Sequence, residues 1–329
     1  MINYIFRRIG YMAVTLVIIV ILSYLIIELP PGTYIESEIA RLRQQGGNVG
    51  QDQINALTKR YGLDKPMYVR FGLWVGGMFH WPPDFGESFA YRLPVRGLIA
   101  NRLGLTIAIS TFSLLVSWGI AIPLGVYSAT HRYTLPDYGI TVLQFFGLSI
   151  PGFLLALVLM LFAQRVLGQQ VGGLFSDQYT TAPWSLAKFG DLVQHLWIPI
   201  VVIAFGSTAW LSRVMRANLL DTLNMQYVQT ARSKGLTENV VVWKHAVRNA
   251  LHPLIMILGG SLPGLISGET IIALVMNIPT VGPMYFQAQL QKDEYLAITF
   301  LMFLAFLGVL GNLLADIALA WVDPRIRYE

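Results

Sequence analysis

Six long apolar runs, separated by polar segments, dominate this 329-residue chain. At 1.5 Å per residue, each run is long enough to cross the hydrocarbon core of a bilayer, about 30 Å thick, as a helix. Hydrophobic residues make up 55% of the chain and charged residues only 12%, which is too apolar for an ordinary soluble domain. The runs cover residues 9–27, 103–127, 138–162, 196–214, 253–276 and 295–322. The sequence therefore predicts an all-α polytopic membrane protein with six transmembrane helices.

Several kinds of chemistry are excluded by residues that the sequence lacks. The chain has no Cys, so it offers no disulfide and no thiolate metal site, and its His residues show no metal-binding spacing such as HExxH. No Gly-Lys dipeptide occurs, so the phosphate-binding GxxxxGK[ST] loop is absent. We therefore expect no catalytic residue, no metal and no cofactor in this chain. Any ATP hydrolysis is expected on a separate subunit.

Positive charge sets the expected orientation. The net charge is +5, and basic residues gather before the first run, in the short loop at His131 and Arg132, and in residues 217–252. Because basic loops are retained on the cytoplasmic side, we expect these segments and both termini to be cytoplasmic. The same bias accounts for the basic composition without nucleic-acid binding, which we do not expect. No small-residue cleavage site follows the first run, so it is predicted to remain as a helix.

A polar segment over residues 30–102 is predicted on the outer side. Short helices are expected at about residues 35–44, 52–61 and 67–79, and an interfacial helix after Pro94 is expected to lead into the second span. Two roles stay open for this segment, a cap that meets a substrate-delivery protein and a passive loop packed over the helices. The predicted organisation is an N-terminus with the first span, an outer insertion and a five-helix core, at residues 1–29, 30–102 and 103–329.

The longest inner segment, residues 217–252, is basic and favours helix. Residues 225–234 contain no Gly or Pro, and Gly235 suits a helix C-cap because glycine adopts the left-handed conformation without a Cβ clash. Thr237 opens a second helix, and Pro253 suits the first turn of the next span. A helix, a glycine corner and a second helix make a compact lobe. We expect a soluble partner to bind it.

This lobe resembles the cytoplasmic EAA loop of bacterial ABC-type importer permeases. The resemblance rests on Gln229, Thr230 and Ala231, followed after three residues by Gly235, with Gln229 where the motif has a leading Glu. The chain as a whole is similar to permeases of the dipeptide and oligopeptide importer family. Further matches, in the family's order along most of the chain, are Tyr61-Gly62-Leu63-Asp64-Lys65-Pro66, Asp84-Phe85-Gly86 with Ser88, Pro94-Val95 with Leu98-Ile99 and Arg102-Leu103, and Asp323-Pro324-Arg325.

The resemblance implies a type I ABC importer permease fold and a larger assembly in the bacterial inner membrane. This assembly would hold a second homologous permease subunit, two ATP-binding subunits carrying ATP and Mg, and a periplasmic substrate-binding protein, with membrane lipid around the spans. The implied substrate is a dipeptide or an oligopeptide. Relatives with this architecture also serve oligosaccharides and nickel complexes, and the largely uncharged spans do not decide between these substrates.

The resemblance also implies that a short helix of the lobe docks into a cleft of the ATP-hydrolysing subunit. Thr230 and Ala231 are small enough for close docking, and Gly235 supplies the corner. The residues expected to couple the two subunits are Gln229, Thr230, Ala231, Arg232, Lys234 and Gly235.

A second set of candidates for helix packing or the transport pathway lies within the spans. Gly260, Gly264 and Gly268 recur every four residues and form a smooth stripe that lets another helix come close, in this chain or in a second subunit. Glu269 lies beside this stripe in an apolar span, where a carboxyl group is costly unless it is paired, protonated or hydrated. It could line the pathway, make a buried hydrogen bond or ion pair, or couple transport to an ion. Many relatives carry their glutamate one helical turn later, where this chain has Ala273.

Ser149 and Pro151 interrupt the centre of the third run. A proline within the bilayer frees backbone groups, which are tolerated only where protein or a water-lined cavity satisfies them. A packing kink and a break that lines the pathway both remain open here.

The leading hypothesis is therefore the membrane subunit of an ATP-driven importer that works by alternating access. An ion-coupled secondary transporter using Glu269 is the main hypothesis from another class, although no internal repeat relates two halves of the chain. A membrane scaffold without transport activity is a third.

Overall fold

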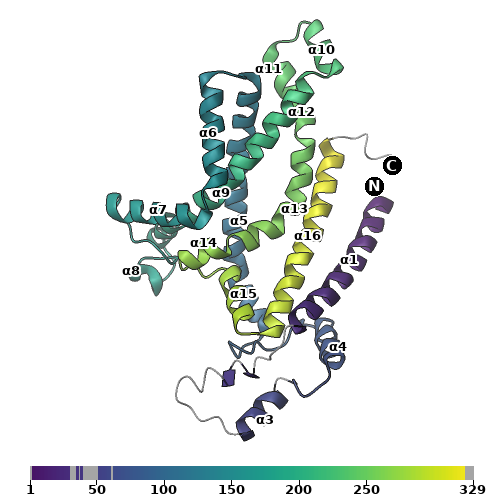
Figure 1. Cartoon of the computed structure of the whole chain (residues 1–329), viewed down its shortest axis with the longest axis vertical. Coiled ribbons are helices and arrows are strands. Elements are labelled where there is room, and N and C mark those ends of the chain that lie inside the picture. The colour runs from purple at the N-terminus through teal and green to yellow at the C-terminus, as the bar shows by residue number, and fades with distance from the viewer. Residues whose placement is uncertain (1, 30–34, 37, 40–50, 61, 323–329) are drawn as a thin grey trace. The chain divides into compact units, whose positions relative to one another are not determined.

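The computed structural model describes residues 2–29, 35–36, 38–39, 51–60 and 62–322. Helices build this part of the chain, together with one isolated β-bridge between Glu87 and Pro94 (Figure 1). The all-α prediction is therefore confirmed for these residues. The helices are α1 (Ile2–Glu28), α3 (Gln51–Arg60), α4 (Met67–Met78), α5 (Val95–Thr130), α6 (Leu135–Ser149), α7 (Gly152–Val166), α8 (Asp177–Thr180), α9 (Leu186–Leu223), α10 (Gln226–Ser233), α11 (Glu238–Val240), the π-helix η1 (Val241–Ala246), α12 (Val247–Ala250), α13 (His252–Gly268), α14 (Thr270–Val275), α15 (Val281–Leu290) and α16 (Glu294–Val322).

Four of the described helices are long and apolar enough to cross a membrane. The number rises to five if the bent pair α6 and α7 counts as one span. The segments are Arg7–Glu28 within α1, Val95–Thr130, Leu186–Leu223 and Glu294–Leu319. These segments confirm a polytopic helical membrane protein, while the predicted count of six rests on two runs that the structure breaks.

The third run is broken between α6 and α7, which meet at an angle of 104°. The cause is Pro151, because a proline disfavours helical backbone in the residue before it. Ile150 is accordingly extended, with φ −84° and ψ 121°. The sequence predicted an interruption at the centre of the run over residues 138–162, and the structure breaks the helix there.

The fifth run is broken as well. The chain turns at Glu269, whose ψ of −13° departs from the helical value of about −42°. The 17 residues of α13 therefore stop at Gly268, and the short α14 continues beyond the turn. The expectation of one continuous helix over residues 253–276 is wrong.

The outer insertion contains helices close to two of the predicted ones, α3 and α4. The predicted helix at residues 35–44 lies largely outside the described residues. The helix predicted after Pro94 is present and continues without a break into the second span, because α5 runs from Val95 to Thr130 as one helix of 36 residues. Helix α15 was not predicted, since its ten residues follow a turn and are too few to show a clear apolar period.

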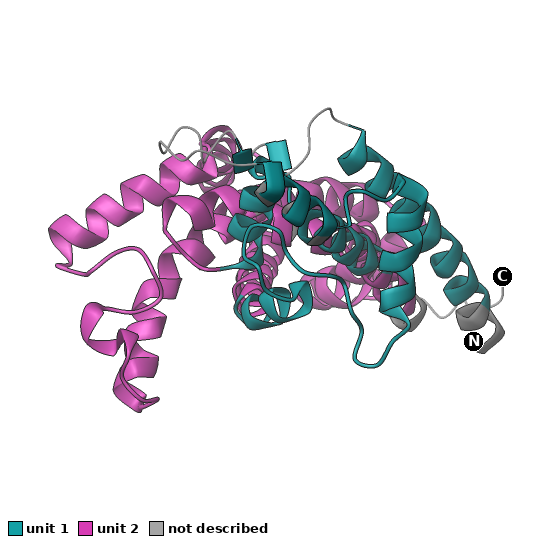
Figure 2. Ribbon diagram, turned by 90° about the horizontal axis from the view of Figure 1, so that it is seen from below, with its two compact units in different colours: residues 1–105, 280–309 teal, residues 106–279, 310–329 magenta. Residues whose placement is uncertain are grey.

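The described chain divides into two compact units (Figure 2). One unit takes residues 1–105 and 280–309, and the other takes residues 106–279 and 310–329. Every candidate site residue lies in the second unit.

Arg70 of α4 holds the first unit together. It is 8% exposed and donates hydrogen bonds to Glu28 at the end of α1 and, at 2.6 Å, to Glu294 at the start of α16. Breaking a buried ion pair leaves an uncompensated charge, so these contacts tie α4 to both helices. Three buried side chains pack beside the ion pairs: Tyr24, Trp74 and Ile298.

Candidate functional site

The lobe between α9 and α13 has the predicted form. Helix α10 ends at Ser233 with Lys234 as its C-cap, and Gly235 follows in the left-handed region with φ +76°. Thr237 stands at the N-cap position of α11, and proline occupies the first turn of α13 as expected. The prediction of a helix, a glycine corner and a second helix is confirmed. The π-helical winding of η1 in that second helix was not predicted.

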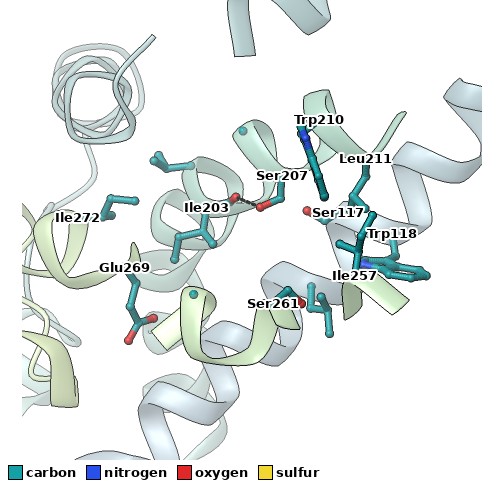
Figure 3. A pocket seen from close by; sticks show the side chains of 14 residues that line it. Ser117, Trp118, Ile203, Ser207, Trp210, Leu211, Ile257, Ser261, Glu269 and Ile272 are labelled. Carbon is teal, nitrogen blue, oxygen red and sulfur yellow. Dashed lines mark hydrogen bonds between the residues drawn. The ribbon is translucent and has the colours of Figure 1, made fainter. Parts of the chain in front are cut away.

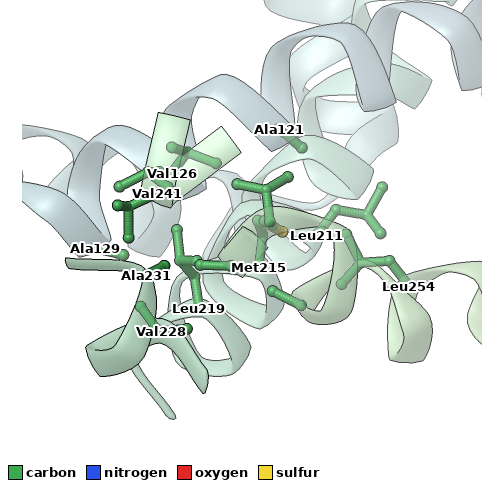
Figure 4. Close-up of a cluster of buried hydrophobic side chains, with 14 residues drawn as sticks. Ala121, Val126, Ala129, Leu211, Met215, Leu219, Val228, Ala231, Val241 and Leu254 are labelled. Atoms are coloured by element: carbon green, nitrogen blue, oxygen red, sulfur yellow. The ribbon is translucent and has the colours of Figure 1, made fainter. Parts of the chain in front are cut away.

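A continuous apolar core supports the lobe (Figure 4). Its side chains come from α5, α9, α10, η1, α12 and α13, so the lobe is packed directly onto the long helices. Close-packed interiors resist compression, and a displacement of α10 is therefore passed to α9 and α5. The core consists of Ala121, Val126, Ala129, Leu211, Met215, Leu219, Val228, Ala231, Val241, Val242, Ala246, Val247, Ala250 and Leu254.

The predicted coupling residues divide into an outer and an inner group. Gln229, Thr230, Lys234 and Gly235 are exposed on the lobe. Ala231, in contrast, is only 6% exposed and packs into the core of its own lobe. Its small size therefore serves internal packing, while the exposed group is the surface open to a partner.

An ion pair clamps the glycine corner. Arg232 donates two hydrogen bonds to the carboxylate of Glu238, from Nη2 at 2.7 Å and from Nε at 3.1 Å. The hydrogen bonds from Arg232 lower the pKa of Glu238 below its ordinary value of 4.5. The two side chains come from opposite sides of Gly235, so the pair bridges α10 and α11 across the corner.

A pocket of about 430 Å³ lies between α5, α9, α13 and α14 (Figure 3). Glu269 lines it and is 2% exposed. Trp118 and Trp210 also line it, and in Figure 3 both lie on the opposite side from Glu269. The rest of the wall is largely aliphatic, so the pocket combines one carboxyl group with two indole rings in a space of small-molecule size.

Three serines add polar groups to this pocket without leaving their hydroxyl protons free. Ser117 donates to the carbonyl of Ala204 at 3.1 Å, and Ser207 donates to the carbonyl of Ile203 at 3.1 Å. Ser261 bonds its own helix in the same way. Their oxygen lone pairs remain available as acceptors. Sequence reasoning identified only Glu269 and Gly264 among the lining residues. The others were missed because they come from four different helices, and in the sequence each is an ordinary member of its apolar run.

Ser149 and Pro151 do not join Glu269 in the pocket. Both are exposed at the break between α6 and α7. The break nevertheless positions Gly152, where an added Cβ would lie 3.3 Å from Cδ1 of Ile272. Since Ile272 lines the pocket, the break supports the pocket wall from behind.

Two glycines of the stripe, Gly260 and Gly264, make no close helix contact within the described chain. A Cβ at Gly260 or Gly264 would meet none of its atoms within 4 Å, and both glycines are exposed. The close contact is made by Gly259 instead, where a Cβ would lie 2.8 Å from the carbonyl oxygen of Gly311. Sequence reasoning missed Gly259 because Gly259 and Gly260 are adjacent and lie on different faces of the helix, and the sequence does not show which face meets another helix. Gly268 is the last residue of α13.

The membrane-length helices, the packed lobe and the pocket together define a membrane transport component. Residues 121–328 match the family described as "Binding-protein-dependent transport system inner membrane component", and residues 1–110 match its N-terminal family. The chain belongs to this family. It is thus a permease component of an ABC transporter, with ATP hydrolysis on a separate subunit.

Individual relatives agree with this assignment. The chain is 36% identical to the oligopeptide transport system permease protein AppB of Bacillus subtilis, over 99% of both chains. It is 29% identical to the dipeptide transport system permease protein DppB of Lactococcus lactis subsp. cremoris, over 99% of this chain and 100% of that protein. The fold is similar to a chain of the MetNI methionine ABC transporter in inward-facing conformations. The TM-score is 0.51 with 17% identity, covering 69% of this chain and 97% of that chain.

Proposed function

We propose that this chain is the permease subunit of an importer for dipeptides or oligopeptides delivered by a periplasmic binding protein. The observation that carries the proposal is the full-length match to an oligopeptide permease at 36% identity. The pocket is compatible with such a substrate, because it pairs a carboxyl group with aromatic and hydroxyl groups that suit an ammonium and a polar main chain.

The proposed topology has six crossings, made by α1, α5, the pair α6 and α7, α9, the pair α13 and α14, and α16. Both termini lie in the cytoplasm. The basic lobe supports this orientation, since short loops rich in Lys and Arg are retained on the cytoplasmic side. The proposed parts are the first span, the outer insertion and the five-helix core, at residues 1–29, 30–102 and 103–329.

Helix α10 is proposed to dock into a cleft of an ATP-binding subunit that holds ATP and Mg. Gln229, Thr230 and Lys234 would contact that subunit, while Ala231 and Arg232 maintain the shape of the lobe. The continuous core supports this proposal, because it joins α10 to α5 and α9. Closure of two ATP-binding subunits would thereby move the helices that line the pocket.

A second homologous permease is proposed to complete the pathway. Glu269 would face the substrate, and the exposed stripe at Gly260 and Gly264 would accept a helix of that second subunit. The absence of a close neighbour for these two glycines within the described chain supports this arrangement. Ser149 and Pro151 would act indirectly, by holding α7 against the wall of the pocket.

Copurification and uptake test the proposal together. A tagged chain extracted gently from its native membrane is expected to bring an ATP-binding subunit and a second permease with it. The reconstituted complex is expected to take up labelled dipeptides or oligopeptides only with ATP and the binding protein. Uptake of oligosaccharide instead would contradict the peptide assignment, and uptake driven by an ion gradient without ATP would contradict the importer mechanism.

A further inference from the structure

A second cavity, of about 220 Å³, lies between α5, α6 and α9, and we call it the groove. It shares no lining residue with the pocket that Glu269 lines, although α5 and α9 contribute to both. The residues of α9 that line the groove include Val201, Phe205 and Ser212. Those that line the pocket of Glu269 include Ile203, Ser207 and Trp210. The groove therefore lies on a different face of these helices and needs its own explanation.

The wall of this groove is almost entirely hydrocarbon. Two of its polar side chains, Gln144 and Ser212, are buried and bond each other at 3.0 Å. The rim exposes Ile120 by 48%, Leu143 by 61% and Val201 by 40%. Exposed apolar surface of this kind marks a binding surface or contact with lipid.

The length of the groove matches one leaflet of a bilayer. From Val201 to Ser212 this face of α9 rises about 17 Å. Half of the hydrocarbon core measures about 15 Å. The groove is also narrow, since 220 Å³ accommodates an extended chain but not a helix about 10 Å across.

An exposed cation lies next in sequence to the groove-lining residue of α9 that is nearest to the lobe, Ser212. Arg213 follows Ser212, and its guanidinium carbon lies 4.8 Å from the ring centroid of Phe145. Among the described residues, no carboxylate forms an ion pair with Arg213. One turn later, Arg216 is already paired with Asp137 at 2.8 Å. Arg213 is therefore the cation at this level that is open to a further anion.

We propose that this groove binds an anionic phospholipid, with one acyl chain along α5, α6 and α9 and the phosphate at Arg213. An arginine guanidinium suits phosphate because its planar donors match the phosphate oxygens. The lipid belongs to the leaflet on the side of the lobe, since α9 continues from Arg213 toward the lobe. The proposal goes beyond peptide import and does not depend on the identity of the substrate.

Photolabelling of the assembled transporter tests the site. The complex is placed in nanodiscs of phosphatidylcholine containing a little phosphatidylglycerol with a diazirine on its acyl chain, and labelled peptides are mapped by mass spectrometry. We expect label on the groove-lining parts of α5, α6 and α9, displaced about fivefold better by phosphatidylglycerol than by phosphatidylcholine. Equal competition by both lipids, label spread evenly over all spans, or a second subunit covering the groove would overturn the proposal.

Two substitutions with matched controls sharpen the test. Arg213→Gln is expected to lower labelling about fivefold, while Arg132→Gln is expected to leave it unchanged, although Arg132 is also exposed and lies over an aromatic ring. Leu143→Trp should fill the groove and abolish the label, whereas Leu115→Trp, at a position also 61% exposed but outside the groove, should not. Size-exclusion chromatography confirms that each variant assembles. Unchanged labelling in Leu143→Trp, or equal losses in the controls, would contradict the site.

Discussion

The lobe and the pocket that Glu269 lines belong to the same unit but are built in opposite ways. The lobe is filled by buried aliphatic side chains from six helical segments, and its polar groups lie on its surface. The pocket leaves about 430 Å³ open and keeps Glu269 in its wall. The contrast fits the proposed roles, because a part that transmits motion needs dense packing and a part that admits a solute needs space and polar groups. The contrast predicts that the lobe is sensitive to lost volume and the pocket to lost charge.

The largest effect is expected from Leu219→Ala in the core of the lobe. Leu219 is 0% exposed, so truncation removes buried methyl groups and leaves a cavity, at a cost of about 2–5 kcal/mol in unfolding free energy. Denaturation of the purified complex measures this loss. Leu236→Ala is the control, because Leu236 is 41% exposed on the same lobe and should cost far less. Equal costs at both positions would show that the lobe is not tightly packed.

Gly235→Val should come next, by straining the corner of the lobe. At φ +76° a β-branched residue is strongly disfavoured, by about 1–2 kcal/mol or more, whereas Asn tolerates this region. A Cβ would meet no described atom within 4 Å, so the strain is in the backbone alone. We expect Gly235→Val to lose ATP-dependent uptake and binding of the ATP-binding subunit, and Gly235→Asn to retain both. Normal coupling in the valine variant would remove the lobe from the coupling mechanism.

The same contrast explains which features the sequence could predict. The corner at Gly235 and the flanking helices follow from local signals, namely a run without Gly or Pro, a cap residue and a glycine. The break at Pro151 is equally local, because proline restricts the residue before it. Its size, 104°, depends on packing and could not be predicted. Neither could the π-helix η1, since its residues also suit an ordinary α-helix.

The pocket could be predicted only at Glu269 and Gly264. A carboxyl group in an apolar run is conspicuous by itself, but Trp118 and Ser207 gain meaning only when distant helices bring them together. The glycine that packs against another helix could not be predicted for the same reason. Gly259 and Gly260 are equivalent in sequence, and only the position of Gly311 shows which of them packs closely.

Glu269→Gln should separate function from stability in the pocket. Glutamine keeps the size of the side chain and its capacity for hydrogen bonds and removes the charge, so the unfolding free energy should change less than uptake does. Uptake should fall about tenfold, equivalent to about 1.4 kcal/mol. Ile272→Val is the control, because it trims the adjacent wall by one methylene for about 1 kcal/mol and keeps the charge. Full uptake by the glutamine variant would leave Glu269 with a structural role alone.

The smallest effect is expected from Glu238→Gln at the surface clamp of the lobe. Glu238 is 61% exposed, so its ion pair with Arg232 contributes less than about 1 kcal/mol. Because Arg232 lowers the pKa of Glu238 below 4.5, this contribution is present above that pH and disappears as the pH falls through the lowered value. Denaturation of the unchanged protein and of Glu238→Gln measures the unfolding free energy of each. The difference between these two free energies should be small at pH 7 and smaller still at pH 3.

Arg232→Lys completes this test, because lysine keeps the charge but loses the two parallel hydrogen bonds. We expect it to retain part of the stability that Glu238→Gln loses, and to reduce coupling only slightly. The lobe would then be held mainly by its apolar core, with the ion pair adjusting the corner. If either surface substitution destabilised the protein as strongly as Leu219→Ala, electrostatics would hold the lobe, and the contrast with the pocket would fail.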